Sequence, residues 1–452
     1  MKQLTTINPY LEKNIKTYHY DDISKVDKRL MILHKSQKNW ANTSLESRAT
    51  LILKLSSALR ENVHFLAKLM TDEMGKPITQ SRAEVYKCAD ACEFFAKQSP
   101  ALVHNILQAS GAPKNIHLSP IGVVFIIMPW NFPLWQVIRA TVPALLMGNT
   151  IILKHSPNTT GCALAFEKLL SKIHPHLLKF TIADNTLASK IIAHPIVQAV
   201  SLTGSTKAGR SVASLSGQHI KKSVLELGGS DPYIVFPDAD IQKAAQLCAQ
   251  SRLINSGQSC IAAKRFLLHK EIYSEFKQHL IEAFEKQRTG NPRLEETTIG
   301  PLARKDLAKN LRLQVSKSLR QGAKLAYEQE LQMEKGYFYP MQILEKVKPG
   351  NIAFEEELFG PVAALASFKT DDEALRLANL SIYGLGAALY TNNTKRIERF
   401  QQELETGSIF INDFVKSQSH LPFGGIKASG YGRELGLFGL MEFTNIKTVV
   451  RS

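Results

Sequence analysis

The feature that most constrains the fold of this chain is a regular alternation of strand-type and helix-type segments from residue 121 onward. Short apolar runs such as "IGVVFIIMP", "TIILKH" and "VQAVSLTG" are separated by helix-length segments such as "LWQVIRATVPALLMG". Strands that alternate with helices predict an α/β fold, because a helix carries the chain back between two parallel strands. The alternation continues on both sides of a glycine-rich stretch, "LELGGSDP", at residues 225–232, where we place a domain boundary.

Length and composition indicate a soluble protein of several domains. The 452 residues exceed a single domain of roughly 100–200 residues, so we expect two or three. The N-terminal stretch "MKQLTTINPYLEKNIKTYHY" is polar, and no apolar run has the roughly 20 residues of a membrane helix. We therefore expect no signal peptide and no membrane contact. The five cysteines are scattered, which favours a reducing compartment and a cytoplasmic location.

The net charge of +16 raises the question of a nucleic-acid partner. The lysines are spread along the whole chain, without a basic block or an aromatic–basic motif. A solvated basic surface is the favoured interpretation, and we expect no nucleic-acid partner. Such a surface would attract anionic substrates or dinucleotides mildly.

Two segments after apolar runs have features of a nucleotide site. Gly204 and Ser205 in "SLTGSTKAG" stand between a strand and a helix, whose N-terminal N–H groups can bind a phosphate. A plain turn explains these residues equally well. Lys154 ends the strand "TIILKH", where ligands bind in open parallel sheets. It could contact a ribose or phosphate, or extend into solvent.

Three residues are candidates for catalysis. Cys260 ends "NSGQSC", with no histidine or cysteine spacing typical of a metal site, and is either an inert core thiol or a nucleophile. Asn131 lies between two prolines in "MPWNFP", where its amide either stabilises an oxyanion or satisfies a turn. Glu226 ends a strand beside two glycines and is either a general base or the partner of a nearby cation. We expect no metal.

Taken together and in order, the motifs of this chain resemble those of the NAD(P)-dependent aldehyde dehydrogenase superfamily. They are "PWNFP" at 129–133, "TGS" at 203–205, "LELGG" at 225–229, "GQSC" at 257–260, "EEELFGPV" at 355–362 and "PFGGIKASGYGRELG" at 422–436. The interval from Glu226 to Cys260 is also that of the superfamily. Within it, "MPWNFPLWQV", "LKHSPN" and "LELGGSDP" are most similar to the short bacterial succinate-semialdehyde dehydrogenases.

The resemblance implies two Rossmann-type parallel-sheet domains and a small β hairpin for oligomerisation. Residues 1–103 and 121–226 would form the NAD(P)-binding domain, and residues 227–414 the catalytic domain. Residues 104–120 and 431–452 would be oligomerisation segments, which implies a homodimer or homotetramer.

The resemblance also implies a mechanism. The Cys260 thiolate would attack the aldehyde, and the Asn131 amide and the Cys260 backbone N–H would hold the oxyanion. Loss of hydride to the nicotinamide would give a thioester, which water activated by Glu226 would hydrolyse. Asn445 stands where some members carry a second glutamate, so we expect Glu226 to act as the only carboxylate in proton transfer.

By the same resemblance, one group of residues would bind the cofactor: Trp130, Lys154, Pro157, Gly204, Ser205, Leu227, Glu357 and Phe359. Pro157 stands where NAD-selective members carry a glutamate. A carboxylate there would repel a 2′-phosphate, whereas proline does not, so we expect both NAD and NADP to be accepted.

Arg139, eight residues after Asn131, matches the arginine that binds the substrate carboxylate in succinate-semialdehyde dehydrogenases; alternatively it pairs with a local acid. The second arginine of some such enzymes is Ile254 here, and Lys416, Ser417 or Ser419 would supply the missing partner. We expect oxidation of succinate semialdehyde or a similar small aldehyde. Another aliphatic or aromatic aldehyde, or a non-catalytic binding role, is the alternative.

We predict that Cys260→Ala abolishes dehydrogenase activity and leaves cofactor binding near normal, because only the nucleophile is removed. Turnover is measured by NAD(P)H absorbance and cofactor binding by fluorescence titration. Turnover close to that of the natural chain would show that Cys260 is not the nucleophile.

Overall fold

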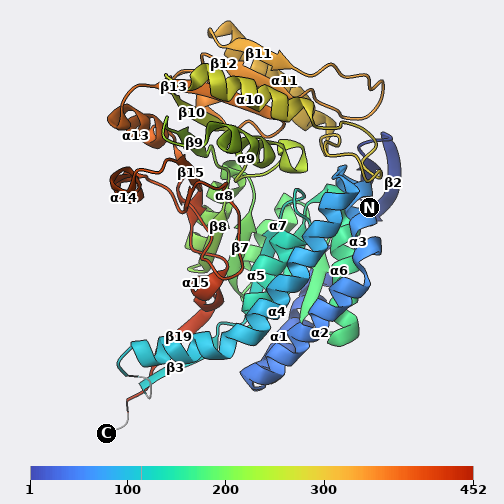
Figure 1. Cartoon of the computed structure of the whole chain (residues 1–452). Coiled ribbons are helices and arrows are strands. Elements are labelled where there is room, and N and C mark those ends of the chain that lie inside the picture. The colour runs from blue at the N-terminus through green and yellow to red at the C-terminus, as the bar shows by residue number, and fades with distance from the viewer. Residues whose placement is uncertain (1, 113–114, 451–452) are drawn as a thin grey trace.

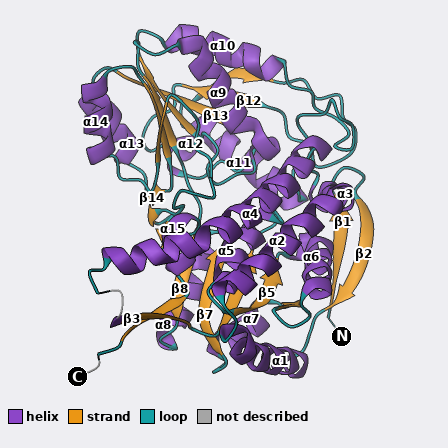
Figure 2. Ribbon diagram, turned by 60° about the horizontal axis from the view of Figure 1, so that its bottom comes forward, coloured by secondary structure: helices purple, strands orange, loops and turns teal. Residues whose placement is uncertain are grey.

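The computed structural model describes residues 2–112 and 115–450. Two large sheets organise the chain, each covered by helices on both faces, and a projecting arm leaves the body at the lower left (Figure 1; Figure 2). The expected α/β fold with parallel sheets is confirmed. No helix in the described part of the chain is both long and apolar enough to cross a membrane.

The first sheet has six strands, and all neighbouring strands are parallel except β18 against β8. In spatial order the strands are β18 (Gly430–Tyr431), β8 (Lys222–Glu226), β7 (Val197–Thr203), β4 (Val123–Met128), β5 (Thr150–His155) and β6 (Leu178–Thr181). The chain runs outward from β4 to β5 and β6 on one side and to β7 and β8 on the other. This reversal of strand order makes a topological switch point at the carboxyl ends of β4 and β7, which is where ligands bind in such sheets.

Alternate residues of the central strand pack on opposite faces of the first sheet, as the two-residue period of a strand requires. Val124 and Ile126 belong to a core shared with helices on one face, and Val123 and Phe125 to a core on the other. The helices of the first face are α2 (Leu45–Glu61), α3 (Val63–Met74), α4 (Ile78–Ala109), α5 (Trp135–Leu146) and α6 (Thr160–Ile173). Those of the second are α1 (Ile23–Ala41), α7 (Asn185–Ala193) and α8 (Thr206–Gln218).

The second sheet has seven strands, with β11 antiparallel at one edge and the others parallel. Its order is β11 (Lys324–Glu328), β12 (Gln342–Glu345), β13 (Val362–Phe368), β10 (Arg265–His269), β9 (Pro232–Val235), β15 (Ala387–Tyr390) and β16 (Ile409–Ile411). One face packs on α9 (Ile241–Leu253) and α10 (Tyr273–Glu285). The other packs on α11 (Lys305–Arg320), α12 (Ile352–Glu355), α13 (Asp371–Asn379) and α14 (Thr394–Glu403).

Three small antiparallel sheets complete the fold. β1 (Gln3–Asn8) pairs with β2 (Lys13–His19), and β14 (Tyr383–Gly384) pairs with β17 (Ile426–Lys427). β3 (Ile116–Pro120) pairs with β19 (Thr444–Thr448), and a short helix, α15 (Gly436–Met441), precedes β19.

The expected hairpin over residues 104–120 is wrong. Its first six residues continue α4 to Ala109, and β3 finds its partner in β19 rather than in a neighbouring segment. The reason is that "HNILQA" keeps helix-compatible spacing, whereas the partner of β3 lies hundreds of residues away and leaves no local signal. Residues 431–452 are likewise not one segment: Tyr431 belongs to the first sheet, and the β19 residues pair with β3.

Candidate active site

Cys260 lies on a loop whose backbone is strained in a specific way. The loop follows a 3₁₀ turn, η3 (Ile254–Gly257), in which Asn255, Ser256 and Gly257 all have positive φ, at 53°, 54° and 75°. Three consecutive left-handed residues turn the chain sharply out of α9. The Cys260 side chain is partly exposed, whereas the other four cysteines are buried.

Buried cations hold this loop through its carbonyl groups. Arg252 donates to the Gly257 carbonyl at 2.6 Å and to the Ala263 carbonyl at 2.9 Å. Lys264 donates to the carbonyls of Ser259, at 3.0 Å, and Cys260, at 2.6 Å. Because charged donors form strong hydrogen bonds in a buried site, the backbone around the thiol has little freedom.

Burial raises the pKa of the Cys260 thiol to about 12, and the positive charges of Arg139 and Lys264 oppose this rise. The thiol is therefore protonated at neutral pH in this structure. Attack on an electrophile then requires removal of that proton as the bond forms.

Asn131 is buried beside the Cys260 loop. Its side-chain Nδ2 donates to the Gln258 backbone carbonyl at 3.1 Å. The backbone carbonyl of Asn131 accepts from Asn255 Nδ2 at 2.7 Å. The structure thus brings Asn131 and the loop of Cys260 together. A side-chain amide held in this way has a fixed direction, as a donor to an oxyanion must.

Glu226 ends β8 in a buried position. Neither of its carboxyl oxygens has a hydrogen-bond partner among the described residues, and a Cβ at Gly424 would lie 2.6 Å from Oε1. Burial raises the pKa of Glu226 well above that of an ordinary glutamate, and the charge of Glu434 raises it further, while Arg139 and Arg433 lower it. A raised pKa makes this carboxylate a stronger proton acceptor than an ordinary glutamate.

Glu434 is a second carboxylate whose charge acts on Glu226. Glu434 is buried and pairs with Arg139, whose Nε lies 2.5 Å from Glu434 Oε2. It lies in the "GYGRELG" motif, on the segment that β18 brings against β8. Asn445, which drew attention in the sequence, instead lies in β19 opposite Ser119.

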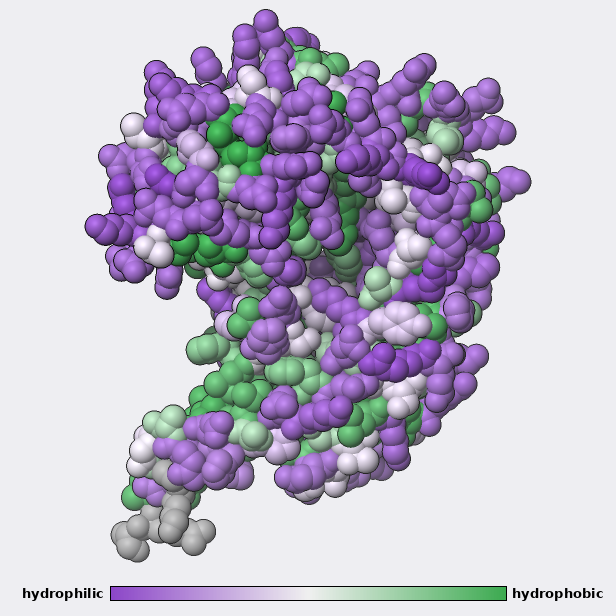
Figure 3. All heavy atoms as spheres, viewed as in Figure 1, coloured by the Kyte–Doolittle hydropathy of each residue, from purple (hydrophilic) through white to green (hydrophobic). Residues whose placement is uncertain are grey.

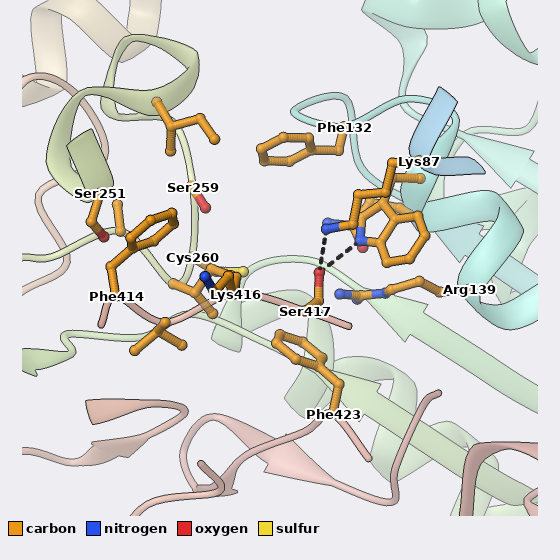
Figure 4. A pocket seen from close by; sticks show the side chains of 16 residues that line it. Lys87, Phe132, Arg139, Ser251, Ser259, Cys260, Phe414, Lys416, Ser417 and Phe423 are labelled. Carbon is orange, nitrogen blue, oxygen red and sulfur yellow. Dashed lines mark hydrogen bonds between the residues drawn. The ribbon is translucent and has the colours of Figure 1, made fainter. Parts of the chain in front are cut away.

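A pocket of about 540 Å³ of empty space, part of it open to solvent, reaches Cys260 (Figure 4). Aromatic rings and three cations line it. The lining includes Lys87, Trp135, Arg139, Cys260, Lys416 and Ser417. Of the residues considered for substrate binding, Arg139, Lys416 and Ser417 share this lining. Ser419 is not part of it, and its carbonyl accepts from the Gly436 N–H at 3.0 Å. Lys87, on α4, had no sequence motif around it and was missed.

The residues considered for cofactor binding gather mainly at the carboxyl edge of the first sheet. Lys154 lies near the end of β5, and Pro157 begins the short turn η2 (Pro157–Thr159) after it. Gly204 follows β7, and Ser205 caps α8 by accepting from the Ala208 N–H at 3.3 Å.

The remaining residues of this set lie beside the seam between the two sheets. The rings of Trp130 and Phe359 meet edge to face, with centroids 5.7 Å apart. Glu357 lies 3.4 Å from Lys264 Nζ and accepts from the Gly229 N–H at 3.3 Å. Leu227 packs so closely on α8 that a Cβ at Gly209 would lie 2.4 Å from it.

The donors at this edge fit an anionic dinucleotide. The N–H groups at the start of α8 and the Lys154 ammonium suit phosphate and ribose oxygens, and the Trp130 ring offers an aromatic face. No group of three or more His, Cys, Asp or Glu side chains that could hold a metal occurs in the described ranges.

Comparisons with known proteins agree on one family. The sequence model of the aldehyde dehydrogenase family matches residues 1–449. The chain is 40% identical over 447 residues to the succinate semialdehyde dehydrogenase [NAD(P)+] Sad of Escherichia coli, covering 98% of this chain and 97% of that protein. It is 38% identical over 455 residues to the succinate-semialdehyde dehydrogenase [NADP(+)] of Deinococcus radiodurans, covering 99% and 94%. The solved succinic semialdehyde dehydrogenase of Streptococcus pyogenes, in complex with NADP+, superposes with a TM-score of 0.94 at 31% identity, covering 99% of each chain.

We predict that Gly257→Ala destabilises the protein and displaces the Cys260 loop. A Cβ there would lie 2.3 Å from the Gly360 backbone, and φ is already positive, so the cost is at least about 1–2 kcal/mol. Gly217→Ala is the matched control, because a Cβ at Gly217 has no atom within 4 Å and helix α8 favours alanine. Thermal unfolding and the rate of Cys260 labelling by a thiol reagent are measured. Equal unfolding midpoints for the two variants would contradict the prediction.

Proposed function

This chain belongs to the aldehyde dehydrogenase family, and from that premise we propose that it oxidises succinate semialdehyde to succinate with NAD+ or NADP+. The observation that supports this substrate is that three cations, Lys87, Arg139 and Lys416, line the pocket that reaches Cys260. A short aldehyde with a carboxylate at its far end would bring that carboxylate among them while its carbonyl carbon meets the thiol. The names of the relatives support the same substrate.

In the proposed mechanism, Cys260 is the nucleophile and Glu226 the base. Cys260 gives its proton to Glu226, which passes it to solvent, as its sulfur adds to the aldehyde carbon, and the Asn131 amide and the Cys260 backbone N–H stabilise the oxyanion of the thiohemiacetal. When bound, the nicotinamide supplies a hydride acceptor. The thioester left on Cys260 is hydrolysed by water that Glu226 deprotonates, and its raised pKa favours this role.

For the cofactor, we propose that the unit built on the first sheet binds the dinucleotide through Trp130, Lys154, Pro157, Gly204 and Ser205. Residues 227–414 contribute Leu227, Glu357 and Phe359 to the same site and supply Cys260. Pro157 carries no charge, so it neither competes for the ribose 2′-hydroxyl nor repels a 2′-phosphate. Both cofactors are therefore accepted.

We also propose that the chain forms a homodimer or homotetramer through the arm of β3 and β19. Apolar side chains gather where the arm leaves the body (Figure 3), and Phe438 and Ile446 are 62% and 60% exposed. Exposed apolar groups beside a free strand edge are typical of an association surface.

The test of the substrate is a comparison of succinate semialdehyde with butyraldehyde, which has the same carbon chain without the charge. A charge-assisted contact worth roughly 1.5–3 kcal/mol predicts a kcat/KM about 10–100-fold higher for succinate semialdehyde. The assay is NAD(P)H absorbance with each cofactor, and Cys260→Ala is the blank. Equal values for the two aldehydes would refute the substrate.

We predict that Glu434→Gln moves the acid limb of the kcat–pH profile to lower pH. The negative charge of Glu434 raises the pKa of Glu226, and Arg139 lowers it. Removing that negative charge, and with it the partner of Arg139, lowers the Glu226 pKa, so the base is ionised at lower pH. An unchanged limb, or one shifted to higher pH, would show that Glu434 does not set this pKa.

A further inference from the structure

The three cations of the Cys260 pocket differ in their acidic partners. Arg139 pairs with Glu434 at 2.5 Å, and Lys416 pairs with Asp413 at 2.6 Å. Lys87 has no acidic partner within 4.0 Å among the described residues. The two pairs are locally neutral, so the uncompensated positive charge of the pocket belongs to Lys87.

The surroundings of Lys87 position its ammonium group. Its Nζ donates to Ser417 Oγ at 3.0 Å and lies 4.2 Å from the centroid of the Trp135 ring. Burial lowers the pKa of Lys87 to about 8, and the charge of Arg139 is the second cause. The ammonium form therefore predominates at neutral pH. One of its three N–H groups binds Ser417, which leaves two for an anion.

Ser417 has a hydroxyl hydrogen that the described residues do not use. Its Oγ accepts from Lys87 Nζ and also from Trp135 Nε1, each at 3.0 Å (Figure 4). A hydroxyl has two acceptor lone pairs and one donor hydrogen, so two incoming bonds direct that hydrogen to a third group. Two N–H groups of Lys87 and the hydroxyl hydrogen of Ser417 therefore lie side by side, and none of the three has an acceptor among the described residues.

The helices that carry this pair are fixed to each other. Glu84, one turn before Lys87 on α4, accepts from the N–H groups of Leu134 and Trp135 at the start of α5, each at 2.9 Å. The same carboxyl group pairs with the buried Lys76. These bonds align Lys87 with Trp135, so the donor pair exists before a ligand arrives, which reduces the ordering cost of binding.

We propose that the Lys87 ammonium and the Ser417 hydroxyl form the principal anion-binding site for the far carboxylate of the substrate. The site selects short aldehydes with a carboxylate at the opposite end. This inference rests on the proposed function. It assigns recognition of the substrate's negative charge mainly to Lys87, on α4. Arg139, whose charge is offset by Glu434, has a smaller share in it.

The experiment compares Lys87→Met, which keeps chain length and removes the charge, with the natural chain on succinate semialdehyde and butyraldehyde. We expect KM for succinate semialdehyde to rise about 10–100-fold, the equivalent of one lost charged contact. We expect KM for butyraldehyde and both kcat values to stay within about twofold, as only far-end binding is lost. Lys87→Arg, which restores a charged donor, should recover most of the loss.

The matched control is Lys97→Met on the same helix, because Lys97 is exposed and pairs with Glu93. It should leave both KM values unchanged. Turnover of butyraldehyde by Lys87→Met shows that the variant is folded. Calorimetric titration with succinate adds a readout that needs no turnover, and Lys87→Met should weaken succinate binding by the same factor.

The outcomes separate the two proposals. If the natural chain does not prefer succinate semialdehyde, the proposed substrate fails, whatever Lys87 does. If the natural chain does prefer succinate semialdehyde, the substrate stands. The assignment of Lys87 is then overturned if Lys87→Met raises KM equally for both aldehydes or for neither.

Discussion

The buried ion pair between Arg139 and Glu434 connects parts of this site that are far apart in the sequence. It joins α5, which forms the wall of the pocket, to the segment that follows β18 at the edge of the first sheet. Both charges act on Glu226, with opposite effects on its pKa. Breaking a buried pair leaves a charge uncompensated and costs far more than the pair contributes, so the two elements are held in a fixed relation. The same pair satisfies Arg139 and leaves Lys87 as the cation of the pocket without an acid.

The loop of Cys260 shows how buried cations can replace regular structure. Arg252 and Lys264 bind carbonyl groups on both sides of the thiol. Residues 255–257 have left-handed backbone angles, so this part of the loop can be neither α-helix nor β-strand. The backbone strain is thereby balanced by charged hydrogen bonds. The thiol itself stays at the surface of a pocket that residues of α4, α5 and α9 and of neighbouring loops line.

Much of the fold could be predicted from the sequence, because buried parallel strands appear in it as short apolar runs such as "IGVVFIIMP". The pairing of β3 with β19 could not be predicted, since nothing in the sequence of either strand indicates which other strand it pairs with. Glu226 and Cys260 could be selected from the sequence because they stand in distinctive motifs. Glu434 lies inside the "GYGRELG" motif, but only the tertiary fold brings it to Arg139, so its pairing has no signal in the sequence. Lys87 could not be found at all: a lysine on an amphipathic helix looks solvent-exposed until the tertiary fold places Trp135 and Ser417 beside it.

The pairing of β18 with β8 also bears on how the chain folds. Ser429 donates to the Gly228 carbonyl although the two residues are 201 positions apart. Contacts of such long sequence separation form late, because the entropy of closing a long loop must be overcome before they contribute. The surroundings of Glu226 are therefore completed among the last events of folding. An intermediate that lacks this contact has the nucleophile without a positioned base, so an aldehyde that meets the thiol at this stage forms a reversible thiohemiacetal and yields no acid.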